Sequence, residues 1–411
     1  MVNRNTSYGE PVYQSRKSLV NEKASYDTLT LISMKSKKAI SPKRMQAEGH
    51  SKQPVTLKTL AEHLGLSRTT LSMILNDVPD ATRFPEETRR RVVETAKEIG
   101  YRPNYFARSL GKRRSYLVGV IAPDLGDGYE AALLGGFERH LLNTGYTSLV
   151  SNHFWFPGLF QRHIETLCDR GVEALLLIDS TPEEYPGVPV VMICTSRSPI
   201  WSTRVSIDNA FGIRQTLHHL AGIGHKKFAF IKGPQNGGDT IDRWNAVLAT
   251  CQELGIRVNL RLTVQLERLD PTGMRHPEEG RIATQKLLER GVHFTALVAY
   301  NDISALGAMS ALREAGRRIP EDVSVIGFDD IEFAGIAYPP LTTVRQPLRE
   351  MGATAAEVLI RKIEKNETVE NISVRPELIV RSSTCPPGTG SPKAAIKRSA
   401  KSMPAAQRTR N

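Results

Sequence analysis

The sequence has few cysteines and no long apolar segment. Its four cysteines lie far apart along 411 residues and form neither a Cys-x-x-Cys pair nor a cluster with histidine, so we expect reduced thiols and no structural metal. It has no run of about 18 apolar residues, the length needed to cross a membrane. The first residues also lack the apolar core of a secretory signal. We therefore expect a cytoplasmic protein without a metal or other cofactor.

Motifs of catalysis and nucleotide binding are absent as well. The sequence contains no GxxxxGK[ST], GxSxG or HExxH motif. One glycine pattern, GIGHKK at 222–227, follows a predicted helix and precedes a predicted strand. A dinucleotide site needs the opposite order, in which a strand leads through glycines into a helix. Gly224 is therefore more typical of a helix end, and we predict a binding protein and not an enzyme.

Charge is distributed unevenly along the chain. The net charge is +12, and residues 1–53, 54–114 and 385–411 carry +6, +5 and +6, which leaves −5 for residues 115–384. A basic module on a mildly acidic body indicates a polyanionic partner for the module alone. The two ends, 1–53 and 385–411, show no apolar periodicity, and we predict that they are disordered and only increase solubility.

Residues 54–102 have the pattern of a small helical domain. TLKTLAEHLG places leucines at helical spacing, with Thr56 suited to cap the helix start and Gly65 to end it. Ser67 caps a second predicted helix, whose core face is formed by Leu71, Ile74 and Leu75. A third helix is expected over 85–100. A tight glycine turn between two short helices is typical of a helix-turn-helix domain.

The second predicted helix presents mainly short polar side chains away from its core face. They are Ser67, Arg68, Thr69, Thr70, Ser72 and Met73. Short donors and acceptors allow a helix to approach base edges closely, and an arginine can bond guanine. No acidic residue occurs between Ser67 and Asn76, as an anionic partner requires. The alternative is a helical protein-binding module, but charge and geometry together favour double-stranded DNA.

A basic connector, residues 103–114, follows the helical domain. Pro103 makes a break after the third helix, and Asn104 can cap a short new one. The connector is basic at Arg108 and again at its end, and Leu110 is an apolar residue of the kind that wedges between base steps in the minor groove. Taken alone, the pattern favours a flexible linker.

Residues 115–384 alternate short apolar runs with helix-length segments. The strand-like runs are LVGVIAP, TSLVSN, ALLLID, VPVVMIC, RVSID, KFAFIKG, TALVAYND and VSVIGFDD. This alternation predicts doubly wound parallel sheets, and 270 residues are too many for one sheet, so we expect two α/β lobes. Ligands of such lobes bind at the carboxyl ends of strands, where this chain has Asp124, Asp208, Asn301, Asp302 and Asp329. For each single aspartate, a helix N-cap is an equally good alternative.

Residues 55–384 resemble the LacI/GalR family of bacterial transcription regulators. Three segments carry the resemblance in the family's order and spacing: VTLKTLAEHLGLSRTTLSMILN with TRRRVVETAKEIGYRPNYFARSL, LAGIGHKKFAFIKGP with DRWNAVL, and ALVAYNDISALGAMSALREAGRRIPEDVSVIGFDD with PPLTTVRQP. The resemblance implies an all-α helix-turn-helix domain and a two-lobed body like periplasmic sugar-binding proteins. It also implies a homodimeric repressor on a near-palindromic operator, with a small effector between the lobes. A tetramer, and a cytoplasmic solute-binding protein without a regulatory role, are the alternatives.

The resemblance also assigns DNA contacts. It implies backbone contacts near Thr56 and Leu57, operator reading by Arg68, Thr69 and Met73, and a phosphate contact near Asn76. The connector becomes a hinge in which Asn104, Ala107 and Leu110 match family positions, with Leu110 as the minor-groove wedge. Met73 departs from the pattern, since many members have arginine or another polar residue there. Methionine can touch a thymine methyl but cannot make two bonds to guanine.

Within the body, the resemblance matches Arg243, Asn301 and Asp329 to effector-contacting positions. An arginine with carboxylates suits ligand hydroxyls, and a sugar or sugar-derived acid is the expected effector. Two departures concern the aromatic residues of the family's site: LGDGYEAAL replaces Asn-Pro and aromatics, and Arg275 or His276 replaces a stacking ring. In the loop NHFWFPG, Phe154 and Trp155 either stack on a sugar or pack between the lobes, and packing is the favoured alternative.

Overall fold

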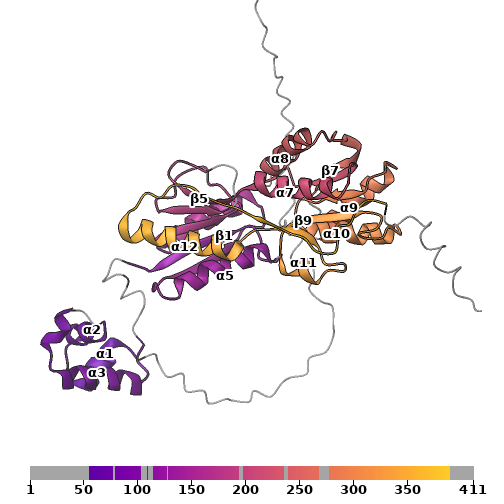
Figure 1. Ribbon diagram of the computed structural model, residues 1–411. Helices are drawn as coiled ribbons and strands as arrows, with labels where there is room; N and C mark the ends of the chain where they lie inside the picture. The colour runs from indigo at the N-terminus through magenta and orange to yellow at the C-terminus, as the bar shows by residue number, and fades with distance from the viewer. Residues whose placement is uncertain are drawn as a thin grey trace, which may run out of the picture. The chain divides into compact units, whose positions relative to one another are not determined.

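The computed structural model describes residues 55–76, 79–102, 109, 114–126, 128–193, 198–235, 239–267 and 277–388 (Figure 1). The chain divides into two compact units between Arg102 and Pro103. Within the described residues, no helix is long and apolar enough to span a membrane. The predicted extension 1–53, most of the predicted tail and the hinge positions Asn104, Ala107, Arg108 and Leu110 lie outside the described residues. The predicted domain boundaries therefore stay predictions.

The first unit is a three-helix domain built around a small apolar core. Its elements are α1 (Leu57–Leu64), α2 (Arg68–Leu75), the 3-10 turn η1 (Pro79–Arg83) and α3 (Glu86–Glu98). One residue from each helix is completely buried, namely Leu60, Leu71 and Val92. Ile74 is also buried and Leu75 packs against the same cluster, so the predicted core face of α2 is confirmed.

The amino-terminal lobe of the second unit contains a six-stranded sheet in the order β11-β5-β4-β3-β1-β2, with every pair parallel. Its strands are β1 (Leu117–Ala122), β2 (Thr147–Asn152), β3 (Ala174–Ile178), β4 (Val190–Ile193), β5 (Thr203–Ile207) and β11 (Ile372–Val374). Helices α5 (Tyr129–Leu141) and α12 (Leu348–Lys365) lie side by side and bury one apolar cluster with the sheet (Figure 1). Helix α6 (Pro157–Asp169) buries a second cluster with it.

The carboxyl-terminal lobe repeats this architecture with the strand order β12-β10-β9-β8-β6-β7. Its strands are β6 (Phe228–Lys232), β7 (Thr263–Gln265), β8 (Ala296–Val298), β9 (Ser324–Asp329), β10 (Thr342–Arg345) and β12 (Glu377–Ile379). Helices α7 (Asn209–Gly222) and α8 (Thr240–Glu253) share one core cluster with the sheet. Helices α9 (Pro277–Glu289) and α10 (Asp302–Glu314) share another. The short η2 (Leu260–Leu262) and α11 (Glu332–Ile336) complete this lobe.

The eight predicted strands are all present, and the predicted fold class is confirmed. One strand pair departs from the parallel pattern, because β12 runs antiparallel to β10. Four further strands, β7, β10, β11 and β12, were not predicted; each has only three or four residues. Such short segments carry no readable periodicity, and their pairing with a sheet is a tertiary event.

The chain passes between the two sheets three times, after β5, after β10 and between β11 and β12. The first crossing leads into α7 and the second into α12. The lobes also touch directly, because Ile303 and Ile331 of the carboxyl-terminal lobe join the apolar cluster around α5 and α12. The strand ends of both lobes therefore meet where a ligand of a doubly wound protein is expected.

Candidate DNA-reading face and interlobe site

The turn between α1 and α2 has the geometry that the sequence predicts. The Thr56 hydroxyl accepts the backbone N–H of Thr59 at 3.2 Å, and the Ser67 hydroxyl accepts that of Thr70 at 3.0 Å. Gly65 ends α1 in the left-handed region, with φ 65° and ψ 28°. This region favours glycine, because the Cβ of any other residue comes too close to the backbone carbonyl oxygen there. Both caps and the glycine turn are confirmed.

The predicted DNA-reading residues of α2 differ in their solvent exposure and in their hydrogen bonding. Arg68 and Thr69 are exposed, whereas Ser72 and Met73 are half-buried. The Asn76 amide donates to the Ser72 carbonyl at 2.8 Å and to the Ser72 hydroxyl at 3.2 Å. Thus Asn76 closes the end of α2.

Three other predicted contact residues also have internal partners. The Thr70 and Ser67 hydroxyls lie 2.9 Å apart and share a hydrogen bond. Leu57 is half-buried against the helical core. Of the predicted face, Arg68 and Thr69 are therefore the most available for a partner.

A contact that the sequence did not reveal joins α2 to η1. The Arg83 guanidinium donates to the Met73 sulfur, with 3.0 Å between Nη2 and Sδ, and its Cζ lies 5.1 Å from the centre of the Phe84 ring. Arg83 lies ten positions after Met73, and η1 is too short to be read from periodicity. No sequence signal pointed to this pair.

Arg243 is the centre of the polar site in the body. It lies in the first turn of α8 and is almost completely buried. Its Nε donates to Asn209 Oδ1 at 2.9 Å, and Nη1 donates to the Tyr300 carbonyl at 2.8 Å. Its Nη2 lies 3.5 Å from Asp239 Oδ2 and 3.7 Å from Asp329 Oδ1. We call these five residues the Arg243 cluster.

The surroundings of Arg243 keep it charged. Burial by itself lowers the pKa of Arg243, but the neighbouring Tyr300, Asp329 and Asp239 outweigh it, and the pKa is raised above its ordinary value. The guanidinium carbon also lies 3.9 Å from the centre of the Phe328 ring, a favourable cation–π arrangement. A permanent, desolvated cation is thereby held where the strands end.

Asp329 has an unusual backbone. Its φ is 117°, a region that residues with a Cβ rarely adopt and that is held only by surrounding structure. The Gln346 amide donates to Asp329 Oδ1 at 2.7 Å. Gln346 begins the second crossing between the lobes, so this bond ties the Arg243 cluster to a crossing segment.

Asp302 is a further buried acid nearby. Its carboxylate accepts the Ile331 N–H at 3.0 Å and the hydroxyl of Thr343. Burial, and then the charge of Asp329, raise the pKa of Asp302 well above its ordinary value. Asp302 therefore fastens β9, β10 and α10 together at their shared end.

The remaining predicted effector residues are bound to local backbone. Asp208 caps α7 by accepting the Phe211 N–H at 2.9 Å, and Asn301 caps α10 in a capping box with Ser304. Asp124 accepts the Gly126 N–H at 2.9 Å. The N-cap alternative thus describes Asp208, and the effector roles of all three stay predictions.

The aromatic loop after β2 is held in a constrained conformation. Phe154 and Trp155 are half-buried and both left-handed, with φ 49° and 62°. Nδ1 of the buried His153 accepts the Trp155 N–H at 3.1 Å, so the ring is the Nε2–H tautomer and donates to Ser180 at 2.7 Å. The Trp155 ring packs edge-on against His153, with centres 6.0 Å apart.

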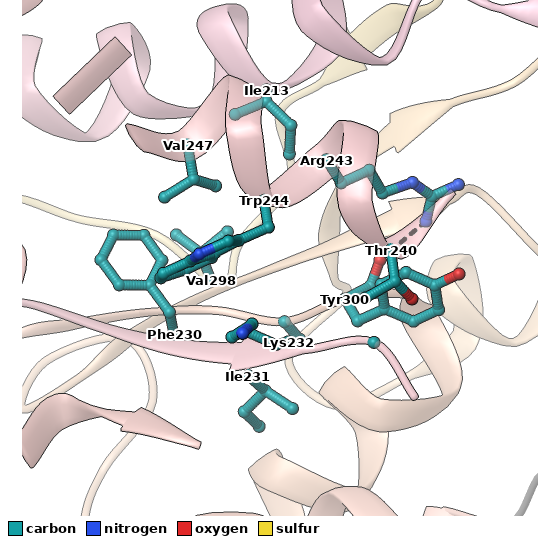
Figure 2. A pocket seen from close by; sticks show the side chains of 12 residues that line it. Ile213, Phe230, Ile231, Lys232, Thr240, Arg243, Trp244, Val247, Val298 and Tyr300 are labelled. Atoms are coloured by element: carbon teal, nitrogen blue, oxygen red, sulfur yellow. Dashed lines mark hydrogen bonds between the residues drawn. The ribbon is translucent and has the colours of Figure 1, made fainter. Parts of the chain in front are cut away.

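Two hollows adjoin the Arg243 cluster. One lies within the carboxyl-terminal lobe, where Phe230, Trp244, Val247 and Val298 form an apolar wall, and Thr240, Arg243 and Tyr300 lie at its polar end (Figure 2). The other is a polar groove between the lobes. Arg204, Ser206 and Ser373 line one side, and the other side is lined by Asp242 and Asn245 of α8 and by Asp239, which precedes that helix. Within the described residues, no group of histidine, cysteine and acidic side chains is arranged to hold a metal.

Sequence reasoning found Arg243 and Asp329 but missed Asn209, Asp239, Tyr300 and Gln346. Asp239 stands one helical turn before Arg243, and that spacing is a usable signal. The others come from three different segments, and only folding brings them together.

The chain joins a helix-turn-helix domain with an exposed polar face to two wound lobes. A polar groove between the lobes adjoins the buried charged cluster. Together these features define a DNA-binding protein with a ligand-binding body. Comparison with known proteins gives the family. Residues 217–384 match the model of a periplasmic binding protein-like domain. The chain is 32% identical over 342 residues to the HTH-type transcriptional repressor PurR of Haemophilus influenzae. The aligned region covers 80% of this chain and 98% of that protein.

Solved structures agree on the architecture. The match to the lac repressor dimer bound to operator and the anti-inducer ONPF covers 81% of this chain and all of the repressor chain, with a TM-score of 0.71 and 24% identity. The match to a complex of the transcriptional regulator CelR with cellobiose covers 80% of this chain and 99% of the CelR chain, with a TM-score of 0.59 and 27% identity. The chain belongs to the LacI/GalR family of transcriptional regulators. As a member of this family it is a DNA-binding transcriptional regulator and not an enzyme.

Proposed function

We propose that the chain acts in the cytoplasm as a homodimeric repressor whose operator affinity is set by a sugar or sugar derivative bound at the Arg243 cluster. The buried, permanently charged Arg243 between Asp239 and Asp329 is the observation that carries this proposal. A planar guanidinium beside carboxylates offers donors and acceptors in fixed directions, which suits the hydroxyl groups of a sugar. The related CelR was solved with cellobiose, which supports the same class of ligand.

Control of DNA binding follows from the position of the cluster. Asn209 begins the helix after the first crossing and Gln346 precedes the helix after the second, and both are bonded into the cluster. A ligand that prefers one arrangement of the lobes shifts the population toward it. Because binding free energies are reciprocal, operator DNA then changes effector affinity by the same factor.

The test is a screen of sugars and sugar acids against the full chain, with thermal unfolding as the readout. A ligand that raises the melting temperature is then tested for its effect on binding to DNA that the protein selects from a random duplex library. Arg243→Lys keeps the charge but loses the planar fork, so we expect ligand affinity to fall at least about tenfold, the loss of one charge-assisted bond, with DNA affinity in the absence of ligand unchanged.

Arg214→Lys is the matched control, since Arg214 is exposed on α7 and pairs only at the surface with Glu253. It should leave ligand response and DNA binding unaltered. An Arg243→Lys protein that responds normally to the ligand would refute the site. A screen in which no sugar or sugar acid binds would refute the ligand class.

A further inference from the structure

The guanidinium of Arg83 is held beside the reading helix although Arg83 does not belong to that helix. Arg83 is the last residue of η1, is exposed, and donates to the Met73 sulfur at 3.0 Å. Met73 is half-buried on α2, away from the buried Leu71 and Ile74. The charged end of Arg83 is therefore fixed at the outward side of α2, at the height of Met73.

The chemistry of this contact leaves most of the guanidinium available. Arginine has five N–H donors, and a thioether is only a weak acceptor without charge. Within the described residues Arg83 forms no ion pair with a carboxylate. Its second contact is with the Phe84 ring, whose centre lies 5.1 Å from Cζ, and this partner also carries no charge. The Met73 sulfur and the Phe84 ring thus restrict the orientation of the Arg83 guanidinium without neutralising its charge.

We propose that Arg83 is a sequence-reading residue that bonds the O6 and N7 acceptors of a guanine in the major groove, with Met73 as the residue that positions it. The proposal rests on the DNA-binding function of α2. Guanine is the base that presents two acceptors at the spacing of the arginine fork. Each half-site of the DNA then contains a guanine next to the base pair that Met73 faces.

A phosphate contact is the competing role for an exposed arginine, and the two roles predict different losses. A phosphate contact contributes to binding of every sequence and to its salt dependence. A guanine contact contributes only to the preferred sequence. Arg83→Lys separates them, since lysine keeps the charge for a phosphate but lacks the fork for guanine.

The experiment selects duplexes from a random library with the full-length wild type, Arg83→Lys and Arg83→Gln, and then measures affinity for the wild-type sequence and for random duplex at several salt concentrations. For Arg83→Lys we expect a loss of about five- to a hundredfold on the selected sequence, the range for a bidentate guanine contact. Affinity for random duplex and its salt dependence should stay unchanged. Both variants should select motifs that lack one guanine per half-site.

Arg90→Lys is the matched control, because Arg90 is an exposed arginine of the same domain paired with Glu94 on α3. Met73→Leu tests the positioning role: it keeps an apolar side chain but removes the sulfur, and should weaken the guanine preference without abolishing it. Identical motifs from wild type and both Arg83 variants overturn the proposal. Equal losses on selected and random DNA assign Arg83 to phosphate instead. A wild type that selects no motif refutes the DNA-reading function itself.

Discussion

At the scale of single residues, polar side chains in this protein act mainly by satisfying backbone groups at element ends. Ser67, Asp208 and Asn301 each accept an N–H in the first turn of a helix. Arg243 differs, because its partners come from separate segments and it keeps its charge while buried. A residue of this kind is a better candidate for ligand binding than a capping residue, whose bonding capacity is already used locally.

Asp302 gives a pH-dependent prediction at this scale. Its raised pKa means that the native state holds a proton more tightly than the unfolded chain, so its contribution to stability is complete below the ordinary pKa of 3.8 and is lost as pH rises through the native value. Asp302→Asn cannot ionise. The melting temperature of the variant relative to wild type should therefore rise as the pH increases from the ordinary pKa of 3.8 upward. Thermal unfolding across that range checks this, and a difference independent of pH would contradict it.

At the scale of elements, backbone approach decides how the amino-terminal lobe packs. Helices α5 and α12 bury one apolar cluster together, and glycines let them come close. A Cβ on Gly136 would lie 1.9 Å from the Arg349 carbonyl oxygen, and one on Gly352 would lie 1.9 Å from that of Leu133. Neither backbone can move without separating the helices, so these positions require glycine.

Gly136 and its neighbour make a matched pair of variants. Gly136→Ala should lower the free energy of unfolding by about 1–3 kcal/mol, the usual cost of overpacking. Gly135 has open space around its Cβ position. Gly135→Ala should therefore raise the free energy of unfolding by about 0.5–1 kcal/mol, since alanine is the better helix former. Chemical denaturation of both full-length variants measures this, and equal effects would show that helix propensity and not packing decides.

At the scale of the whole molecule, the proposed function requires that the body influence the helix-turn-helix domain through the connector. The body begins with an anchored segment, since the Arg114 side chain pairs with Glu173 and Glu364, each at 2.8 Å. Glu173 also accepts the backbone N–H groups of Ser115 and Tyr116, at 2.6 and 2.8 Å. Any movement of this lobe is therefore passed directly to the end of the connector.

The connector gives the prediction at this scale. If Leu110 wedges into the minor groove, Leu110→Ala should weaken binding to the selected operator more than binding to random duplex, by about tenfold. The reason is that the wedge acts only where the DNA is bent to receive it. Leu142→Ala, at an exposed leucine of the body, is the control. Equal losses on the two DNAs in a salt-matched gel-shift assay would count against the wedge.

Local chemistry in the sequence determined much of this protein. The caps at Thr56 and Ser67, the left-handed Gly65, the core face of α2 and eight of the strands follow from hydrogen-bonding capacity, glycine conformation and apolar periodicity. These are properties of neighbouring residues, so a single sequence displays them. The family resemblance then pointed to Arg243 and Asp329 from their surrounding motifs.

Only the tertiary structure decided what those residues meet. Asn209, Tyr300 and Gln346 reach the Arg243 cluster from separate segments, and the antiparallel β12 pairs with β10 across a long excursion through the other lobe. The contact of Arg83 with Met73 likewise depends on how η1 turns back toward α2. Contacts between distant segments depend on how whole elements pack, and no local pattern of residues records that packing.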